Sequence, residues 1–482
     1  MLATVYYGIN MTWVYWVMVA IYAVTILSII AVILSENRNP VKSLAWVTIL
    51  LVVPAVGLVI YLFFGRSIKN TRMISRRKRR FLKKQSRYHK REYGDLHLSK
   101  ESVQQIQLAK ALSGSGYYDR NNVVVYNSGE DKFNAFESDL KSAQKFINLQ
   151  YYIIEDDEIG NRIADILVER AKAGVEVRVI YDHVGSFKTK RRYFRRLEEA
   201  RVMAHPFFKV TFPSFGAKLN WRNHRKLCVI DGCIGYIGGM NIADRYIKGT
   251  KYGVWRDCHL RVTGAAIEAL QFSFAVDWSF MGQSLPDEPQ LVDADGLGSG
   301  NVGIQLVTSG PTNQWSNIAL LFLKAIGNAK KSIWIQTPYF LPTESLLKAL
   351  QSAALSKVDV RIMIPRNSDS ILLRYASFSY IQECLNAGIK IYLYDAGMLH
   401  SKTIVIDEEF ATIGSTNFDF RSFEHNFEAN MFIYSREINQ QMREVFNEDM
   451  KKSIRVASSR WRHRNWKEKT LESILRPLSP IL

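Results

Sequence analysis

The sequence predicts an α/β protein with two similar lobes, each a mixed sheet flanked by helices, related by a pseudo-twofold axis and placed behind an N-terminal hairpin of two transmembrane helices. Three observations lead to this prediction. Two apolar runs without charge stand near the N-terminus. One order of alternating strands and helices occurs twice in the rest of the chain. Each copy of that order ends in the pattern H-x-K-x-x-x-x-D, so the two halves repeat both a fold and a motif.

The first 65 residues are predicted to anchor the chain in a membrane. No charged residue occurs from 13 to 34 or from 44 to 64, and each run is long enough to cross a bilayer as a helix. The first run lacks the basic start and the small-residue cleavage site of a signal peptide. Pro54 and Gly57 leave one alternative open for the second run, which could kink or re-enter without crossing.

A basic juxtamembrane segment, residues 66–115, follows the anchor. Its part from Arg66 to Arg91 holds thirteen Lys and Arg and no acidic residue, and it carries much of the net charge of +19. Directly after an apolar run, such a segment favours anionic lipid headgroups over nucleic acid, so we expect no nucleic-acid partner. The same charges place the rest of the chain on the cytoplasmic side of the cell membrane, and two spans return the N-terminus to that side.

The predicted lobes span residues 116–285 and 304–450. In the first, strands are expected at 123–126, 147–154 and 175–181, and helices at 133–145 and 159–173. In the second, strands are expected at 304–307, 332–336 and 358–364, and helices at 318–328 and 344–355. A linker over 286–303, acidic and rich in Gly and Pro, joins the lobes, and a basic tail covers 451–482.

The repeated motif supplies the candidate catalytic residues, which are His224, Lys226, Asp231, His400, Lys402 and Asp407. Residues two apart on a strand share a face, so the histidine and lysine of each copy should point into one cleft. The aspartates lie an odd number of positions further on, where a tight turn is expected. They are therefore predicted to brace the backbone rather than to contact substrate.

Two imidazoles that face each other across a cleft can carry out phosphodiester exchange. One attacks phosphorus and forms a phosphohistidine, and the other protonates the departing alkoxide. Lys226 and Lys402, with Asn241 and Asn417, would donate hydrogen bonds to the non-bridging oxygens. Because these groups supply the positive charge, the chemistry requires no metal and no cofactor.

An imidazole in either role needs a carboxylate that fixes its tautomer. Acidic residues on charged, aromatic segments follow each motif, and Asp257 and Glu428 are the candidates. The residues alone leave open which histidine attacks.

Several further features accompany the motifs, and together they resemble the phospholipase D superfamily. Around the second copy these features are Gly414 to Asn417, Asp419, Arg421-Ser422, and Asn426 with Glu428. A second set resembles bacterial cardiolipin synthases nearly end to end. It comprises Asn39-Pro40, Leu44 to Trp46, Pro54, Gly57, Tyr61, Ser309 to Pro311, Gln336 to Phe340 and Leu478 to Leu482.

This resemblance implies a metal-free reaction between two phosphatidylglycerol molecules. One gives its phosphatidyl group to the enzyme, and the second takes it with release of glycerol. Phosphatidylglycerol and anionic membrane lipids are thus the expected partners. The resemblance also implies that His224 is the nucleophile, oriented by Glu428 of the other lobe, while His400, oriented by Asp257, is the acid and then the base.

Other functions remain open at this point. A phospholipase D-type hydrolase, or another phosphatidyltransferase, would keep every residue named. A membrane-attached nuclease would use the basic run to hold a polyanion, but the anchor argues against it. A scaffold with inactive lobes is disfavoured because both motifs keep their His and Lys. The sequence makes no prediction of the oligomeric state, and it leaves open whether the aromatic, basic stretches at 207–215 and 460–467 contact lipid or pack on a lobe.

Overall fold

The computed structural model describes residues 11–35, 40–53, 56–58, 98–209, 221–284 and 300–480, with single positions at 61, 73, 75 and 77. Most of the predicted basic segment and of the predicted linker therefore lies outside the described residues. The chain divides into two compact units, which are Met1–Ser67 with Thr211–Asn220, and Ile68–Val210 with Trp221–Leu482.

The smaller unit contains α1 (Met11–Ser35) and α2 (Pro40–Val52), which pack together through Ile26, Ile33 and Leu50. Within the described residues, α1 is the one helix long and apolar enough to cross a membrane, over Trp13–Ala31. The 13 residues of α2 are too few to cross a bilayer, which takes about 20. The structure thus shows an apolar N-terminal helix, while the second predicted span, 44–64, is described at 44–53, 56–58 and 61.

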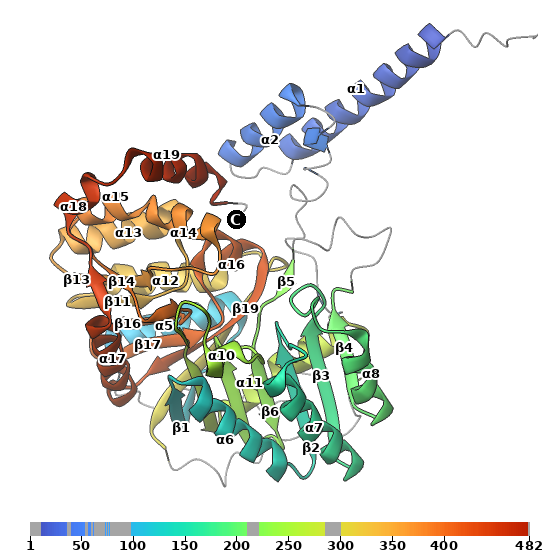
Figure 1. The fold of residues 1–482 in the computed structure, drawn as a ribbon, viewed down its shortest axis with the longest axis vertical. Helices are drawn as coiled ribbons and strands as arrows, with labels where there is room; N and C mark the ends of the chain where they lie inside the picture. Colours follow the sequence, from blue (N-terminus) through green and yellow to red (C-terminus); the bar gives the residue numbers. More distant parts are fainter. Residues whose placement is uncertain are drawn as a thin grey trace, which may run out of the picture. The chain divides into compact units, whose positions relative to one another are not determined.

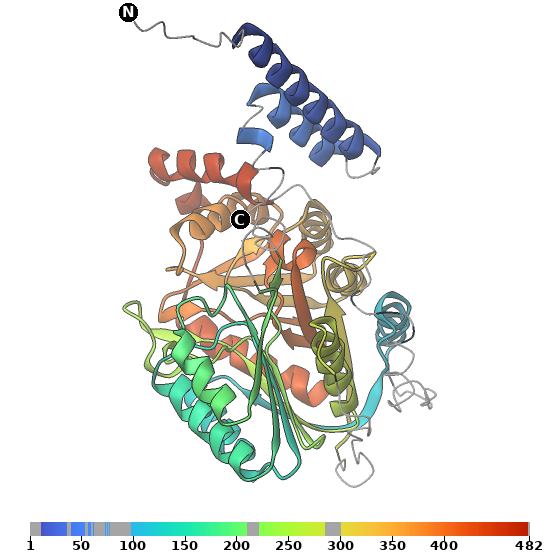
Figure 2. The ribbon, with the colours of Figure 1, turned by 90° about the vertical axis from the view of Figure 1, so that its right-hand side faces the viewer.

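The larger unit is built on one mixed sheet of sixteen strands (Figures 1 and 2). The first half of the chain contributes β1 (Tyr118–Tyr126), α6 (Gly129–Ser142), β2 (Phe146–Tyr151), α7 (Glu158–Lys172), β3 (Glu176–Asp182), α8 (Arg191–Glu199), β4 (Met203–Phe207), β6 (Leu227–Ile230), β7 (Ile234–Gly238), β9 (His259–Gly264) and α11 (Ile267–Phe280). The second half contributes β10 (Val302–Ser309), α12 (Asn317–Asn328), β11 (Ser332–Gln336), α13 (Glu344–Leu355), β13 (Asp359–Pro365), β14 (Lys390–Tyr394), β16 (Thr403–Ile406), β17 (Phe410–Gly414), β19 (Asn426–Tyr434) and α17 (Arg436–Lys451).

All ten strands and helices predicted for the repeat are present; β11 and α13 have the predicted ends, and the other eight have shifted ends. The helix predicted from Phe133 begins at Gly129 because the Ser128 side chain accepts the N–H of Asp131 and caps it. The strand predicted to reach Ile154 ends at Tyr151, and Ile154 forms only an isolated bridge to Ile242.

The strand order is the same when read from either end of the sheet. From one edge it runs β4-β3-β2-β6-β7-β9-β1, and from the other, after β20 (Ser453–Arg455), it runs β14-β13-β11-β16-β17-β19-β10. The two series meet where β1 pairs with β10. In the first half, α6 and α7 cover one face and α11 the other (Figure 2), and α12, α13 and α17 repeat this arrangement in the second half (Figure 1).

Two segments outside the predicted lobes add to the second half. Helix α5 (Lys100–Ser113) buries Ile106 and Ala109 in its core, and β20 extends the sheet beside β14. The tail then forms α18 (Ser458–Arg462), α19 (Trp466–Leu475) and the 3-10 helix η3 (Arg476–Leu478). Within 460–467, Trp461 packs on the second half, where it is buried against Phe378, while Trp466 is exposed.

Candidate active site

Two short strands bring the histidines of the repeated motif into place. β5 (Arg222–Asn223) pairs in parallel with the start of β19, and β15 (Gly397–Leu399) pairs in parallel with β8 (Val254–Arg256). The N–H of His224 then donates to the Phe427 carbonyl at 2.9 Å, and the N–H of His400 donates to the Arg256 carbonyl at 2.7 Å. Each histidine is therefore held by backbone from the other half of the chain.

A buried carboxylate contacts each imidazole. The two oxygens of Glu428 lie 3.0 and 3.1 Å from Nδ1 of His224, and Oδ2 of Asp257 lies 2.7 Å from Nδ1 of His400. The side chains of Glu428 and Asp257 are fully buried, and each histidine is 8% exposed. When Nδ1 carries the proton and donates it to the carboxylate, Nε2 keeps its lone pair for chemistry. The pairs join opposite halves, as the family resemblance implied.

Burial sets the charge of this cluster. It lowers the pKa of His224 to about 4, against the raising effect of Glu428. It also lowers the pKa of His400 to about 4, where the neighbouring Lys402 ammonium adds to the effect and Asp257 opposes it. For the carboxylates burial acts to raise the pKa, but the adjacent cationic groups outweigh it and lower the pKa of both. Near neutral pH the site thus pairs ionised carboxylates with neutral imidazoles.

The two motif lysines lie beside their histidines. Nζ of Lys226 donates to the His224 carbonyl at 2.5 Å, and Nζ of Lys402 donates to the His400 carbonyl and lies 3.7 Å from Oδ2 of Asp257. Burial lowers the pKa of both lysines. The Lys402 ammonium also lowers the pKa of His224, a residue of the other motif. Because the charge of one motif acts on the histidine of the other, the two copies of the motif form one site.

Asp231 and Asp407 hold backbone at the turns that follow β6 and β16. Asp231 accepts the N–H groups of Gln144, Lys145 and Phe146 at 2.7 to 2.8 Å. Asp407 accepts those of the corresponding residues, Lys330, Lys331 and Ser332, at 2.7 to 2.9 Å. Both have positive φ, 50° and 47°, a conformation that Asp tolerates in turns. These are the bracing contacts expected from the sequence, made away from the imidazoles.

The two asparagines are not equivalent. Oδ1 of Asn241 accepts the N–H of Ile153 at 3.1 Å, and its Nδ2 donates to the Tyr246 hydroxyl at 3.0 Å. Asn417 forms a hydrogen bond with Asp419, and its buried Oδ1 has no partner among the described residues. Asn241 therefore holds protein groups with both ends of its amide, whereas Asn417 keeps one end for another contact.

Two buried ion pairs behind the histidines were missed by sequence reasoning. Nη1 of Arg225 lies 2.7 Å from Asp277 of α11, and Nη2 of Arg256 lies 3.0 Å from Asp449 of α17. Each arginine also donates to the backbone carbonyl of a residue whose carboxylate contacts a histidine. Arg225 donates to the carbonyl of Glu428, and Arg256 donates to that of Asp257. The one available signal was a lone aspartate inside the otherwise apolar helix α11.

Comparison with protein families agrees with this geometry. The family described as "Cardiolipin synthase, PLD-like domain" matches residues 136–251 and 322–450. A second family, described as "Phospholipase D-nuclease N-terminal", matches residues 23–66.

Curated relatives match nearly end to end. "Cardiolipin synthase 2" of Bacillus anthracis is 39% identical over 459 residues, which cover 94% of this chain and 89% of that protein. The cardiolipin synthase of Halalkalibacterium halodurans is 38% identical and covers 100% of this chain and 97% of its own length. The major cardiolipin synthase of Bacillus subtilis is 38% identical, with 96% and 98% covered.

A solved structure shares the fold at low sequence identity. The crystal structure of phosphatidylserine synthase from Haemophilus influenzae superposes with a TM-score of 0.61 at 12% identity. The match covers 80% of this chain and 100% of that chain. At this identity the likeness concerns the fold alone.

Proposed function

The chain belongs to the cardiolipin synthase family of phospholipase D-like phosphatidyltransferases, and on that premise we propose how its site makes cardiolipin. The donor is one phosphatidylglycerol, the acceptor is a second, and glycerol is released. One observation carries the proposal: two histidines, each with Nδ1 on a buried carboxylate from the other half, form a single site with two lysines.

The first half-reaction forms a covalent intermediate. Nε2 of His224 attacks the donor phosphorus, a P–N bond forms, and the bond from phosphorus to the glycerol oxygen breaks. His400 donates a proton to that oxygen, so glycerol leaves neutral. Burial holds the pKa of His400 near 4 in the free protein, and the anionic phosphate raises it on binding.

The second half-reaction regenerates the enzyme. His400, now neutral, takes the proton from a glycerol hydroxyl of the acceptor as its oxygen attacks phosphorus. The P–N bond breaks, His224 is free again, and cardiolipin leaves. If water takes the place of the acceptor, the same steps yield phosphatidic acid.

The surrounding groups stabilise the charge that develops. Glu428 faces the Nδ1–H of His224 and stabilises the positive ring of the phosphohistidine. Lys226 uses one donor on the His224 carbonyl, whereas Lys402 donates to the His400 carbonyl and also lies 2.6 Å from Nδ1 of His400. The remaining N–H groups of the two lysines are assigned to the phosphate oxygens. The atom of Asn417 without a partner among the described residues is the acceptor Oδ1, so Asn417 would donate to a phosphate oxygen only with its amide turned over.

We also propose the placement of these parts in the cell. Residues 116–285 and 304–450 act as two lobes related by a pseudo-twofold axis, supported by the strand order that reads alike from both edges. Residues 1–65 form a two-span hairpin, supported by α1 and by its packing against α2; because the 13 residues of α2 are too few to cross a bilayer, the second span would have to extend beyond this helix. The lobes then lie in the cytoplasm, since the basic run after the anchor is retained there.

Product analysis tests the reaction. Purified full-length protein in detergent is incubated with phosphatidylglycerol alone, and glycerol and all lipids formed are measured. Cardiolipin with equimolar glycerol is expected. Phosphatidic acid with glycerol would instead show a hydrolase of the same superfamily, and no lipid product would contradict the proposal.

A donor with a good leaving group tests the roles of the histidines. Phosphatidyl-p-nitrophenol needs no acid, so His400→Ala should still release one equivalent of p-nitrophenolate per site, while His224→Ala releases none. His463→Ala is the matched control, because this histidine is exposed and bonds only the Ser459 carbonyl. The reverse pattern would exchange the two roles, and equal release by both variants would contradict the covalent mechanism.

A further inference from the structure

Helix α14 (Ile371–Phe378) exposes apolar side chains that the proposed chemistry leaves unused. Ile371 is 67% exposed and Leu372 is 51% exposed at its first turn. The other side of the helix buries Ala376 and Phe378 in the core of the second half. The exposed turn is therefore a surface feature of a helix that is otherwise anchored.

A second exposed apolar stripe follows α19 and η3. Trp466 is 68% exposed and Ile474 is 61% exposed, and Leu478 is also exposed. Trp466 and Ile474 stand eight positions apart on α19, which places them toward one side of that helix, and Leu478 follows on η3. Lys467 and Lys469 are exposed beside them.

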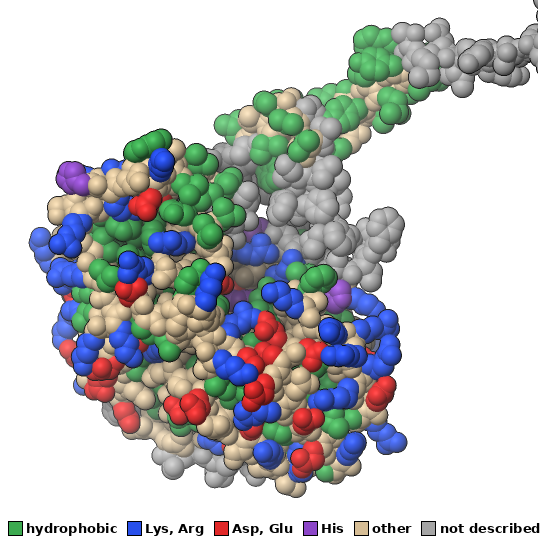
Figure 3. Space-filling view, viewed as in Figure 1, with side chains coloured by type: hydrophobic (Ala, Val, Ile, Leu, Met, Phe, Trp, Pro, Cys, Tyr) green, Lys and Arg blue, Asp and Glu red, His purple; other side chains and the backbone are tan. Residues whose placement is uncertain are grey.

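The two stripes belong to one surface. α14 packs against both α19 and η3. Arg476 of η3 lies 4.5 Å above the Tyr380 ring and pairs with Glu383 at 2.6 Å, which ties the tail to the segment after α14. We call Ile371, Leu372, Trp466, Ile474 and Leu478 the α14–α19 surface. Figure 3 shows apolar side chains gathered where α14 and α19 lie, with basic side chains among them.

This surface adjoins the active site. Asp369, two residues before α14, accepts a hydrogen bond from the Tyr339 hydroxyl at 2.7 Å. Tyr339 packs on the cluster that holds Met398 and Trp255, and the Trp255 ring lies 5.3 Å from the ring of His400. The N–H of Phe340, the next residue, donates to Ser377 of α14 at 3.0 Å. The start of α14 is thus linked to His400 through Asp369, Tyr339 and Trp255.

We propose that the α14–α19 surface docks on the interface of an anionic bilayer and seats the active site against the lipid headgroups. The inference rests on the proposed function, because a phosphatidylglycerol has acyl chains that stay in the bilayer while its phosphate must reach histidines that are 8% exposed. Exposed Ile, Leu and Trp suit the headgroup boundary. The exposed Arg460, Arg462, Lys467 and Lys469 suit anionic lipid.

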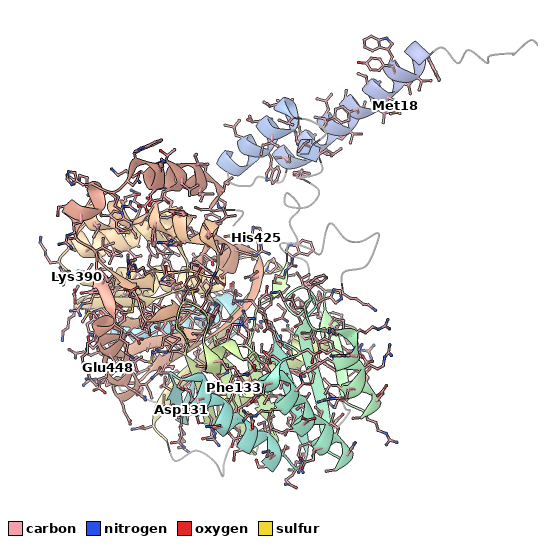
Figure 4. The ribbon with its side chains drawn as sticks, in the orientation of Figure 1. Met18, Asp131, Phe133, Lys390, His425 and Glu448 are labelled. Atoms are coloured by element: carbon pink, nitrogen blue, oxygen red, sulfur yellow. The ribbon has the colours of Figure 1, made fainter. Side chains whose placement is uncertain are left out.

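Depth quenching tests the docking itself. In full-length protein, Cys233, the one cysteine of four that is not buried, is replaced by serine, and a fluorophore is attached to Ile371→Cys or Ile474→Cys. The protein is reconstituted in phosphatidylglycerol and phosphatidylethanolamine vesicles with nitroxide lipids. Both positions should be quenched. Glu448→Cys is the control, on α17 and away from α19 (Figure 4), and should not be. Absence of quenching at 371 and 474 would overturn the proposal.

Activity with two forms of the donor tests its purpose. Ile371→Glu with Leu372→Glu should lower cardiolipin formation from vesicle phosphatidylglycerol by about tenfold or more, since charge is expelled from the interface. With water-soluble dihexanoyl phosphatidylglycerol the rate should stay unchanged. Leu355→Glu is the matched control, because Leu355 is an apolar side chain that is 65% exposed. It lies before the first residue of β13, whereas α14 follows the last, and a strand of this length is about 20 Å long.

The outcomes separate the two proposals. Equal loss with both donors would mean that α14 supports the site and not docking, and no loss with either would also overturn the inference. Quenching in a wild-type protein that makes no cardiolipin would support docking and refute the proposed function.

Discussion

Glu428→Gln is the sharpest test of the cross-half pairing. The substitution keeps the size of the side chain and one acceptor oxygen, but it removes the charge that lies 3.0 Å from Nδ1 of His224. Asn426 donates to one oxygen of the carboxylate and Ser415 to the other, so the glutamine keeps an acceptor for one of them and turns its NH2 group toward the other. The change therefore removes the charge together with one accepted hydrogen bond.

The expected loss can be worked from this distance. A full positive charge on the ring, 3.0 Å from a carboxylate at an effective dielectric constant of about 20, is stabilised by about 5 kcal/mol. The glutamine dipole retains part of this, which leaves a loss of about 4 kcal/mol. At 1.36 kcal/mol for each tenfold change, formation of the phosphohistidine should slow by about 10³-fold.

Stopped-flow release of p-nitrophenolate from phosphatidyl-p-nitrophenol measures this step in a single turnover. kcat should fall and KM should change little, because Glu428 contacts His224 and not the lipid. Glu448→Gln, the same change at an exposed carboxylate, serves as control.

A rate for Glu428→Gln within about threefold of wild type would refute the reasoning, since that corresponds to less than 1 kcal/mol. A large rise in KM with unchanged kcat would also refute it, because it would mean that Glu428 acts in lipid binding.

Four further outcomes are expected. With the activated donor, the rate should stay level through neutral pH and fall below about pH 4, where the buried His224 becomes protonated; a fall centred near pH 6.5 would contradict the low pKa. Asp407→Asn should lower the free energy of unfolding by about 1–3 kcal/mol, seen by thermal denaturation, because a carboxylate that holds three backbone N–H groups is lost at a φ that Asn tolerates. Lys132→Met should raise Tm, since Nζ of Lys132 is buried without a hydrogen-bond partner among the described residues. Burial lowers the pKa of this amine, so the unfolded chain binds a proton there that the folded chain does not. The stability of the wild type, and not of the variant, should therefore rise as the pH rises toward about 10. EDTA should leave transfer unchanged because the proposal assigns the phosphate oxygens to N–H donors of Lys226 and Lys402 rather than to a metal ion, and activity restored only by a divalent ion would contradict this.

Lys132 is a buried amine whose desolvation lowers the stability of the core, and the sequence pattern did not predict its burial. Its side chain lies over the rings of Phe133 and Phe136, 3.8 and 4.2 Å from the centroids, where the helical pattern alone predicts only that the phenylalanines are buried. Figure 4 marks Phe133 inside the first half. Lys132 lies four residues before Phe136, on the buried side of the helix, whereas Lys141, the other lysine of α6, is exposed.

Local pattern was sufficient for the elements of the repeat and for the motif residues. Alternation along a strand and the 3.6-residue period of a helix are properties of neighbouring residues, so β2 and β11, and the helices α7 and α12, could be predicted without knowledge of the fold. The positions of His224 and His400 followed from matched spacing. The apolar character of α1 was equally local.

Only the tertiary structure shows the contacts that the carboxylates named from the sequence make with those histidines. Glu428 reaches His224 across 204 residues of sequence, and Asp257 reaches His400 across 143. These pairs exist because β5 and β15 join strands of the opposite half, and register between distant strands is set by packing and backbone pairing, not by the residues of either segment. Because long-range packing also sets the pairing of Arg225 with Asp277, the sequence did not predict this ion pair. For the same reason, only the structure shows which face of α14 is buried and which is exposed.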